Sequence, residues 1–130
     1  MPITLNGFLP DENEKLMEWL RTDRNGFPYW ENRAVFNMYP YYGMLDLMDA
    51  KERHGNDCTY FMKVENQKSA DYASGIFLYK LADEVVIYLL PISYKSGINI
   101  TGRIQFGQWV LHESKTFRNN VCRLIYRLNK

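Results

Sequence analysis

The sequence predicts a single α+β domain spanning residues 1–130, with N-terminal helices packed on a mainly antiparallel sheet of about four or five strands. Two observations carry this prediction. Apolar residues recur at helical spacing in the first half of the chain, and runs rich in branched and aromatic residues dominate the second half. A C-terminal helix or strand is expected to close the domain. The alternative architecture is a curled sheet around a pocket, with the helices at its mouth, which would favour a small-molecule site.

Two helices are predicted near the N-terminus. Residues 11–22 have an acidic first turn, which suits the positive end of a helix dipole, and Asp11 or Asn13 can cap them. Residues 44–53 form the second helix, and Gly55 stands where a C-terminal glycine is expected. The apolar stripes consist of Leu16, Trp19 and Leu20 in the first helix and Met44, Leu47 and Met48 in the second.

A β-hairpin is predicted at the centre of the chain, from residues 76–81 and 85–92, with a polar turn between them. Both alternating faces of these runs are apolar, so the hairpin should lie in the middle of the sheet and be covered on both sides. The predicted core residues are Ile76, Leu78, Val86, Ile87, Tyr88 and Leu89.

The remaining strands are expected at residues 58–64, 98–106 and 108–112, with a polar loop at 65–74. Residues 115–130 fit two patterns. Asn119 and Asn120 are poor helix formers and favour a strand, whereas an apolar stripe at helical spacing favours a helix. The stripe decides for a helix, and it comprises Phe117, Val121, Leu124, Ile125 and Leu128.

Composition limits the classes of protein to consider. No window approaches about 18 uninterrupted apolar residues, so no membrane span is expected. The start of the chain lacks the pattern of a signal peptide, and Cys58 and Cys122 do not suggest a disulfide scaffold, which together predict a cytoplasmic protein. Residues 1–89 carry nine Lys/Arg and fourteen Asp/Glu, whereas residues 90–130 carry seven Lys/Arg and one Glu, so acidic and basic regions are segregated along the sequence.

Candidate catalytic motifs are incomplete. Gly97 and Gly102 have phosphate-loop spacing, but Arg103 and Ile104 replace the required Lys and Ser/Thr. The four His and Cys residues lack the paired spacing of a zinc site. A strand that ends in Glu113 and Lys115, with Asp83 as an acidic partner, matches only part of a metal-dependent nuclease layout. We therefore expect no catalytic residues, no metal and no cofactor.

An aromatic segment, residues 27–42, is the most unusual part of the sequence, because seven of its sixteen residues are aromatic. Most of these rings should pack the helices onto the sheet. Tyr and Trp also anchor protein interfaces, because they bury a large area at low entropic cost. The predicted anchors are Tyr29, Trp30, Tyr39 and Tyr41, and Arg123 and Arg127 are the predicted charged rim.

The sequence is interpreted as a small non-enzymatic protein that acts by occupying a macromolecular partner, most simply another protein. A phage- or plasmid-type inhibitor of a host defence or nucleic-acid enzyme fits this profile. Direct nucleic-acid binding is the first alternative, through Lys95, Arg103, Lys115, Arg118, Arg123, Arg127 and Lys130. A metal-dependent nuclease is the second alternative.

Overall fold

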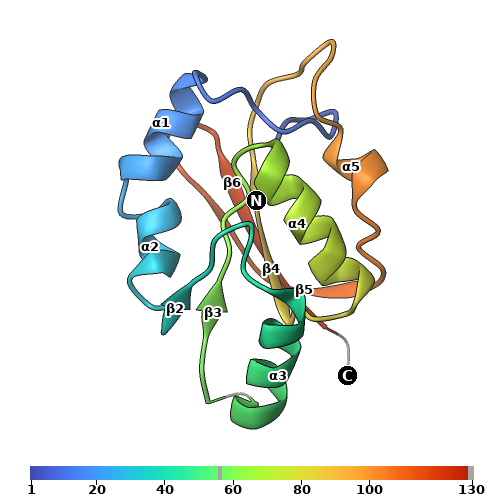
Figure 1. Cartoon of the computed structure of the whole chain (residues 1–130). Coiled ribbons are helices and arrows are strands. Elements are labelled where there is room, and N and C mark those ends of the chain that lie inside the picture. Colours follow the sequence, from blue (N-terminus) through green and yellow to red (C-terminus); the bar gives the residue numbers. More distant parts are fainter. Residues whose placement is uncertain (56, 129–130) are drawn as a thin grey trace.

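The computed structural model describes residues 1–55 and 57–128 and has the expected α+β architecture. A four-stranded sheet has the order β1-β4-β6-β5, and a separate ribbon pairs β2 with β3 (Figure 1). In the sheet, β1 pairs β4 in parallel and the other pairings are antiparallel. The strands are β1 (Pro2–Ile3), β2 (Phe36–Asn37), β3 (Tyr60–Phe61), β4 (Glu84–Leu89), β5 (Trp109–Thr116) and β6 (Cys122–Leu128).

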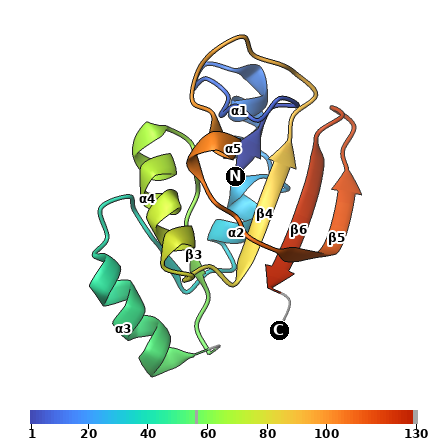
Figure 2. The same cartoon turned by 90° about the vertical axis from the view of Figure 1, so that its right-hand side faces the viewer.

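Helices cover both faces of the sheet. Helices α1 (Lys15–Thr22) and α2 (Phe27–Glu31) lie on one face, and α4 (Gln67–Leu78) and α5 (Ile100–Arg103) lie on the other side (Figures 1 and 2). Helix α3 (Met44–His54) stands at the lower edge of the molecule, away from the strands β5 and β6 (Figure 2). None of these helices, within the described ranges, is long and apolar enough to cross a membrane.

Two apolar clusters form the core, one on each side of β4. Successive residues of a strand point to opposite faces, so β4 supplies both clusters. The cluster under α1 and α2 consists of Met17, Leu20, Phe27, Tyr88, Leu90 and Val121. The cluster under α4 and α5 consists of Ile3, Leu9, Val64, Ala70, Ala73, Ile100 and Ile104, with Ile87 packed against it.

Tyr88 connects strands β1, β4 and β6 to the α1–α2 region. It lies opposite Pro2 of β1 and Arg123 of β6 in the sheet, and its side chain is completely buried. The hydroxyl accepts a hydrogen bond from Trp30 Nε1 (2.9 Å) and donates one to the Asn25 carbonyl (2.6 Å). Tyr88 therefore fixes the position of α2 on the sheet.

The tight connection between α1 and α2 requires glycine. A Cβ atom at Gly26 would lie 2.3 Å from the backbone oxygen of Leu20, far closer than van der Waals contact.

The predicted helix over 11–22 begins later, at Lys15, and its N-cap Glu14 makes no capping bond through its side chain. Neither Asp11 nor Asn13 is therefore the cap. The second predicted helix is confirmed, and Gly55 ends it with φ of 57°.

Of the predicted central hairpin, the second strand is confirmed and the first strand is wrong. Its second run is β4, but its first run belongs to the last turn of α4 and to the turn that follows. The predicted polar loop at 65–74 is mostly α4. Asn66 and Ser69 start this helix with a reciprocal capping box, in which each side chain accepts a bond from the backbone of the other.

The six predicted core residues differ in their burial. Ile76 and Tyr88 are buried, at 7% and 0% exposure, whereas Leu78 is 68% exposed. Val86, Ile87 and Leu89 are half-buried and pack against the helices or the sheet neighbours. Leu78 was wrongly placed because it is the final residue of a helix, and its position in that helix points to solvent.

The preference for a C-terminal helix is also wrong, because residues 109–128 form the β5–β6 hairpin. Its turn uses Asn120 in the left-handed region (φ 68°), which Asn tolerates better than most residues. Asn119 Oδ1 accepts a hydrogen bond from Val121 N (3.1 Å), so the two asparagines shape this turn. The predicted strand at 98–106 is instead α5 with irregular flanks, and the strand at 58–64 shortens to β3.

We predict that Tyr88→Phe lowers the free energy of unfolding by about 1–3 kcal/mol, because Trp30 Nε1 and the Asn25 carbonyl lose a buried partner while the ring stays. Urea unfolding measures this change. Tyr79→Phe is the control, since Tyr79 is 55% exposed, and a surface change should stay within about 0.5 kcal/mol. Equal effects of the two variants would contradict the assigned role of Tyr88.

Candidate functional site

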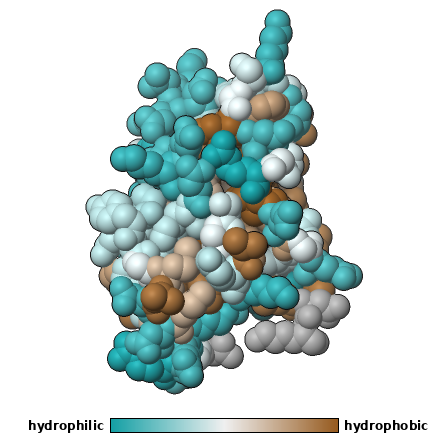
Figure 3. Space-filling view, turned by 45° about the vertical axis from the view of Figure 1, so that its right-hand side comes forward, coloured by the Kyte–Doolittle hydropathy of each residue, from teal (hydrophilic) through white to brown (hydrophobic). Residues whose placement is uncertain are grey.

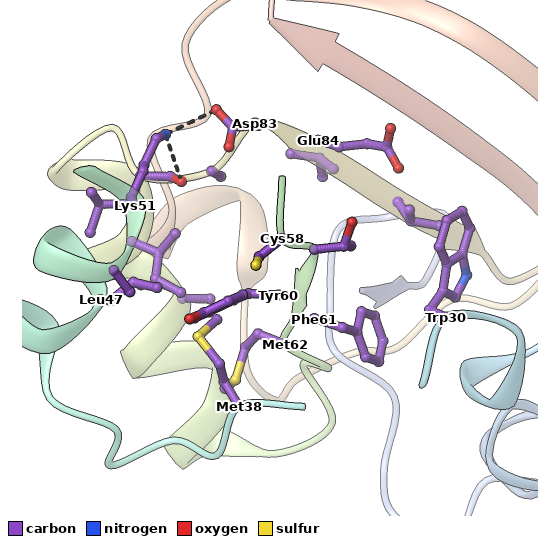
Figure 4. Close-up of a pocket in the computed structure, with 18 of the residues that line it drawn as sticks. Trp30, Met38, Leu47, Lys51, Cys58, Tyr60, Phe61, Met62, Asp83 and Glu84 are labelled. Atoms are coloured by element: carbon purple, nitrogen blue, oxygen red, sulfur yellow. Dashed lines mark hydrogen bonds and ion pairs between the residues drawn. The ribbon is translucent and has the colours of Figure 1, made fainter. Parts of the chain in front are cut away.

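A cavity of about 460 Å³ lies between α3, β3, α4 and the start of β4 (Figure 4). Small-molecule sites commonly occupy about 300–1,000 Å³, so this volume is sufficient for a ligand. The lining is mainly apolar and contains several sulfur-bearing and aromatic side chains, among them Met38, Leu47, Cys58, Tyr60, Phe61 and Met62.

Strand β3 separates two sides of this cavity. Tyr60 lies on the side of Leu47 and α3, whereas Phe61 points toward Trp30 of α2 (Figure 4). The alternation of strand side chains explains this arrangement. Met38 and Met62 lie close to the Tyr60 side in the same view, so the ribbon presents a surface of thioethers and rings toward α3.

Three charged groups of the lining, Lys51, Asp83 and Glu84, are in ion pairs, and Arg33 is held by Tyr29. Lys51 Nζ lies 2.9 Å from Asp83 Oδ1 and donates a hydrogen bond to the Leu81 carbonyl (3.2 Å). Glu84 Oε2 accepts a bond from Arg127 Nε (2.9 Å). Arg33 donates to the Tyr29 carbonyl (2.7 Å), and its guanidinium stacks 3.6 Å from the centre of the Tyr29 ring.

The amine of Met1 also belongs to the lining and is desolvated. It donates a hydrogen bond to the Val86 carbonyl (2.8 Å). Burial lowers the pKa of this amine from 8.0 to about 5, because the charged form loses its hydration. The cavity therefore has a polar but uncharged group on its inner wall at neutral pH.

A second candidate surface lies on the β2–β3 ribbon and in the loop that follows β2. We define the tyrosine surface as the rings of Phe36, Tyr39, Tyr41, Tyr42 and Tyr60. Phe36 lies 5.3–6.4 Å, between ring centroids, from Tyr39, Tyr42 and Tyr60. Tyr39 lies 4.5 Å from Tyr41 and 5.8 Å from Tyr42. These spacings are typical of aromatic contacts.

The tyrosine surface is open to solvent despite these contacts. Tyr41 is 81% exposed and Tyr39 is 42% exposed, and neighbouring Val35 is 68% exposed. Tyr72 of α4 borders the cluster, and its hydroxyl is buried without a hydrogen-bond partner. Burial and the nearby phenols of Tyr42 and Tyr39 raise the pKa of Tyr72, which keeps it neutral.

The six predicted partner-binding residues are divided among three places. Tyr39 and Tyr41 meet on the tyrosine surface. Tyr29 and Trp30 contact each other at 4.8 Å and lie over Arg123, whose guanidinium is 5.1 Å and 5.7 Å from their ring centres. Arg127 is separate and pairs with Glu84 at the side of β4.

Arg123 is a buried cation rather than a rim residue. It is 5% exposed, and it pairs with Glu113 of β5 at 3.1 Å. Phe117 provides a further ring at 5.7 Å, and Arg123 Nε has no hydrogen-bond partner. The aromatic rings replace part of the lost hydration of the guanidinium. Arg123 thereby attaches α2 to β6.

The fold partly neutralises the basic C-terminal region. Arg103, Arg123 and Arg127 each pair with a carboxylate, namely Asp71, Glu113 and Glu84. No ion pair is found for Lys95, Lys115 or Arg118 among the described residues. Lys130, the last basic residue of the predicted nucleic-acid surface, lies outside the described residues.

The partial nuclease layout is not brought together. Glu113 lies on β5, Asp83 precedes β4, and β6 runs between those two strands. Each carboxylate contacts a different cation, Arg123 for Glu113 and Lys51 for Asp83. Within residues 1–55 and 57–128, no group of three or more His, Cys, Asp and Glu side chains could hold a metal ion.

The cavity was not predicted by motif reasoning. Its lining comes from segments spread between Met1 and Val86, and thioethers and small apolar residues give no functional signal by themselves. The available sequence signal was the alternation of Cys58, Tyr60 and Met62 along the predicted strand at 58–64, since residues two apart in a strand share a face.

Comparison with known proteins identifies the fold. The chain matches no family model and no curated protein sequence. It is similar to a solved structure from Shewanella sp. PV-4, provisionally assigned as a riboflavin biosynthesis protein, with a TM-score of 0.70 and 13% identity. The match covers 100% of this chain and 97% of that one. At this identity the likeness shows a shared fold alone.

We predict that acid destabilises the protein partly through the Met1 amine. The unfolded chain binds this proton below about pH 8 and the folded chain only below about pH 5, so the free energy of unfolding falls as pH decreases between these values. At 1.36 kcal/mol per pKa unit, the maximum loss is roughly 4 kcal/mol.

Urea unfolding at pH 8, 7, 6 and 5 measures this effect, with N-terminally acetylated protein as the control. Acetylation retains one N–H for the Val86 carbonyl but removes the titration. The difference between the two forms isolates the contribution of the amine from that of every other titratable group. Parallel pH profiles would show that the amine is not desolvated in the folded state.

Proposed function

We propose that the protein is a non-enzymatic binding protein that docks a protein partner on the tyrosine surface. The observation that supports this most is the exposure of Tyr41 (81%) and Tyr39 (42%) within a cluster of contacting rings. An inhibitor or adaptor that occupies another macromolecule would act in this way.

The mutual contacts of the rings support an interface. A Tyr side chain that already packs against its neighbours loses little conformational freedom on binding, which preserves affinity. Phe36 is half-buried and contacts the rings of Tyr39, Tyr42 and Tyr60, so it restricts the positions that these tyrosine side chains can adopt. Tyr39 and Tyr41 are therefore the proposed anchors.

Trp30 and Tyr29 have a different role in this proposal. Trp30 donates to Tyr88 and packs with Tyr29 over Arg123, so these residues hold α2 on the sheet. They would position the start of the aromatic segment without contacting the partner. The pairing of three C-terminal arginines with carboxylates is the reason to favour a protein over a nucleic acid as the partner.

The test is capture of a partner from a lysate of the source cell by the immobilised protein, followed by purification of that partner and direct titration. We predict that Tyr39→Ala and Tyr41→Ala each weaken binding by at least about 2 kcal/mol, or about 30-fold in Kd. Tyr79→Ala, an exposed tyrosine at the end of α4, should bind as the parent does.

Thermal melting accompanies the titrations. Tyr41→Ala should melt near the parent, because its ring is exposed, whereas Trp30→Ala should melt at a lower temperature. Normal binding by both Tyr39→Ala and Tyr41→Ala would reject the tyrosine surface as the interface. Binding that disappears with nuclease treatment and falls steeply with salt would support the nucleic-acid alternative.

A further inference from the structure

The cavity beneath α3 shares Tyr60 with the tyrosine surface, but the proposed anchors of the partner, Tyr39 and Tyr41, do not line it. Helix α3 is held over this cavity near both of its ends. Near its start, Met44 packs close to Gly75 of α4, where an added Cβ would lie 3.0 Å from Met44 Cε. Near its end, Lys51 bonds to Asp83 and to the Leu81 carbonyl. Between these points, Leu47 and Ala50 are the buried residues of the helix and line the cavity.

The opposite wall is well defined. Ala73 and Ile76 of α4 and Val85 of β4 are each at most 7% exposed and line the cavity. These side chains belong to the rigid body of the fold, so the inner wall is formed before any ligand arrives. Figure 3 shows hydrophobic residues at the surface in the lower half of the molecule. Leu45 of α3 and Leu78 of α4 are exposed apolar residues of the helices that border the cavity.

The charges of the lining favour an uncharged ligand. Arg33 and Lys51 balance Asp83 and Glu84, and each is already engaged by another group. These pairs are partly exposed, at 36% and 55% for Lys51 and Asp83, so they lie at the rim of the cavity. A charged ligand that enters the apolar interior beyond them would have no free counter-ion, and a buried charge without a partner is costly. The low pKa of the Met1 amine indicates that the inner wall around this amine is desolvated.

The thioethers and rings of the lining favour a flat aromatic ligand. Methionine side chains adapt their shape and make favourable contacts between sulfur and the edges of rings. Met38 and Met62 lie beside Tyr60 on the α3 side of the ribbon (Figure 4). Tyr60 can add an offset or edge contact to a planar ligand.

We propose that the cavity beneath α3 is a binding site for an uncharged, fused-ring aromatic small molecule. The ligand contacts Met38, Tyr60 and Met62 with its rings, and α3 closes over it through Leu47 and Ala50. The thiol of Cys58 lies in the wall of this site, where it reports on occupancy.

Thiol labelling provides the test. Cys122→Ser leaves Cys58 as the single thiol, and Cys58→Ser leaves Cys122, which is half-buried on β6 outside the cavity. The probes are 2-naphthol, which is uncharged at neutral pH, and 2-naphthoate, an anion of similar size and shape. Calorimetry with the unmodified chain gives the Kd of each probe.

At a 2-naphthol concentration about ten times its Kd, labelling of Cys58 should slow about 11-fold, because only the unoccupied fraction reacts. Labelling of Cys122 should not change. 2-Naphthoate should bind at least about tenfold more weakly, which corresponds to about 1.4 kcal/mol.

Ala50→Leu adds side-chain volume to the lining and should abolish binding of 2-naphthol, whereas Leu45→Ala, on the exposed face of the same helix, should not affect it. No 2-naphthol binding by the unmodified chain, or binding that leaves Cys58 unprotected, would overturn the proposal. Tighter binding of 2-naphthoate would overturn the ligand class. These results do not depend on partner capture, so the two proposals can fail separately.

Discussion

The arrangement of the whole chain depends on Tyr88, because one residue joins the sheet to the helical layer. Its backbone N–H donates to the Met1 carbonyl (3.0 Å), and it pairs with Arg123 in the antiparallel register of β4 and β6. Its ring packs edge-on against Phe27 and Trp19, and its hydroxyl holds Trp30 and Asn25. Buried Tyr hydroxyls need such partners, and here they come from the α1–α2 region.

This constraint separates the aromatic segment into two groups with different surroundings. Trp30 donates a hydrogen bond to Tyr88, and the Tyr29 ring packs against the guanidinium of Arg123. The rings of α2 therefore pack against the sheet. The chain then leaves α2 and enters β2, where Phe36, Tyr39, Tyr41 and Tyr42 contact one another rather than the sheet. A dense aromatic segment can therefore supply both a core attachment and an exposed surface, and sequence spacing does not distinguish them.

Features with strong local causes were predictable from the sequence. The amphipathic stripe of α3 and its terminal Gly55 identified that helix, and the two-sided apolar run of β4 identified the central strand. Helix α4 was missed because its buried face uses Ser69, Ala70 and Ala73, small residues that carry little hydrophobic signal. A helix was preferred to strand β6 because Val121, Leu124 and Ile125 fit a helical stripe as well as a strand, and the turn at Asn119 and Asn120 decides for the strand.

The candidate sites were less predictable than the fold, because they depend on long-range pairing. The basic C-terminal region loses much of its apparent surface charge when Arg123 and Arg127 meet Glu113 and Glu84, and those partners are set by strand order rather than by spacing. The cavity depends on where α3 stands relative to the ribbon. Spacing along the chain predicts neither arrangement.

The division between Tyr88-centred core and exposed tyrosine surface is the central claim, and nitration of the native protein tests it most directly. Nitration requires an accessible phenol that can ionise, and burial raises the pKa of Tyr88. Peptide mass spectrometry over a short time course should find nitration first at Tyr41, then at Tyr79 and Tyr39, with Tyr88 unmodified while the protein is folded. Modification of Tyr88 as fast as Tyr41, or protection of Tyr41 in the isolated protein, would contradict this account.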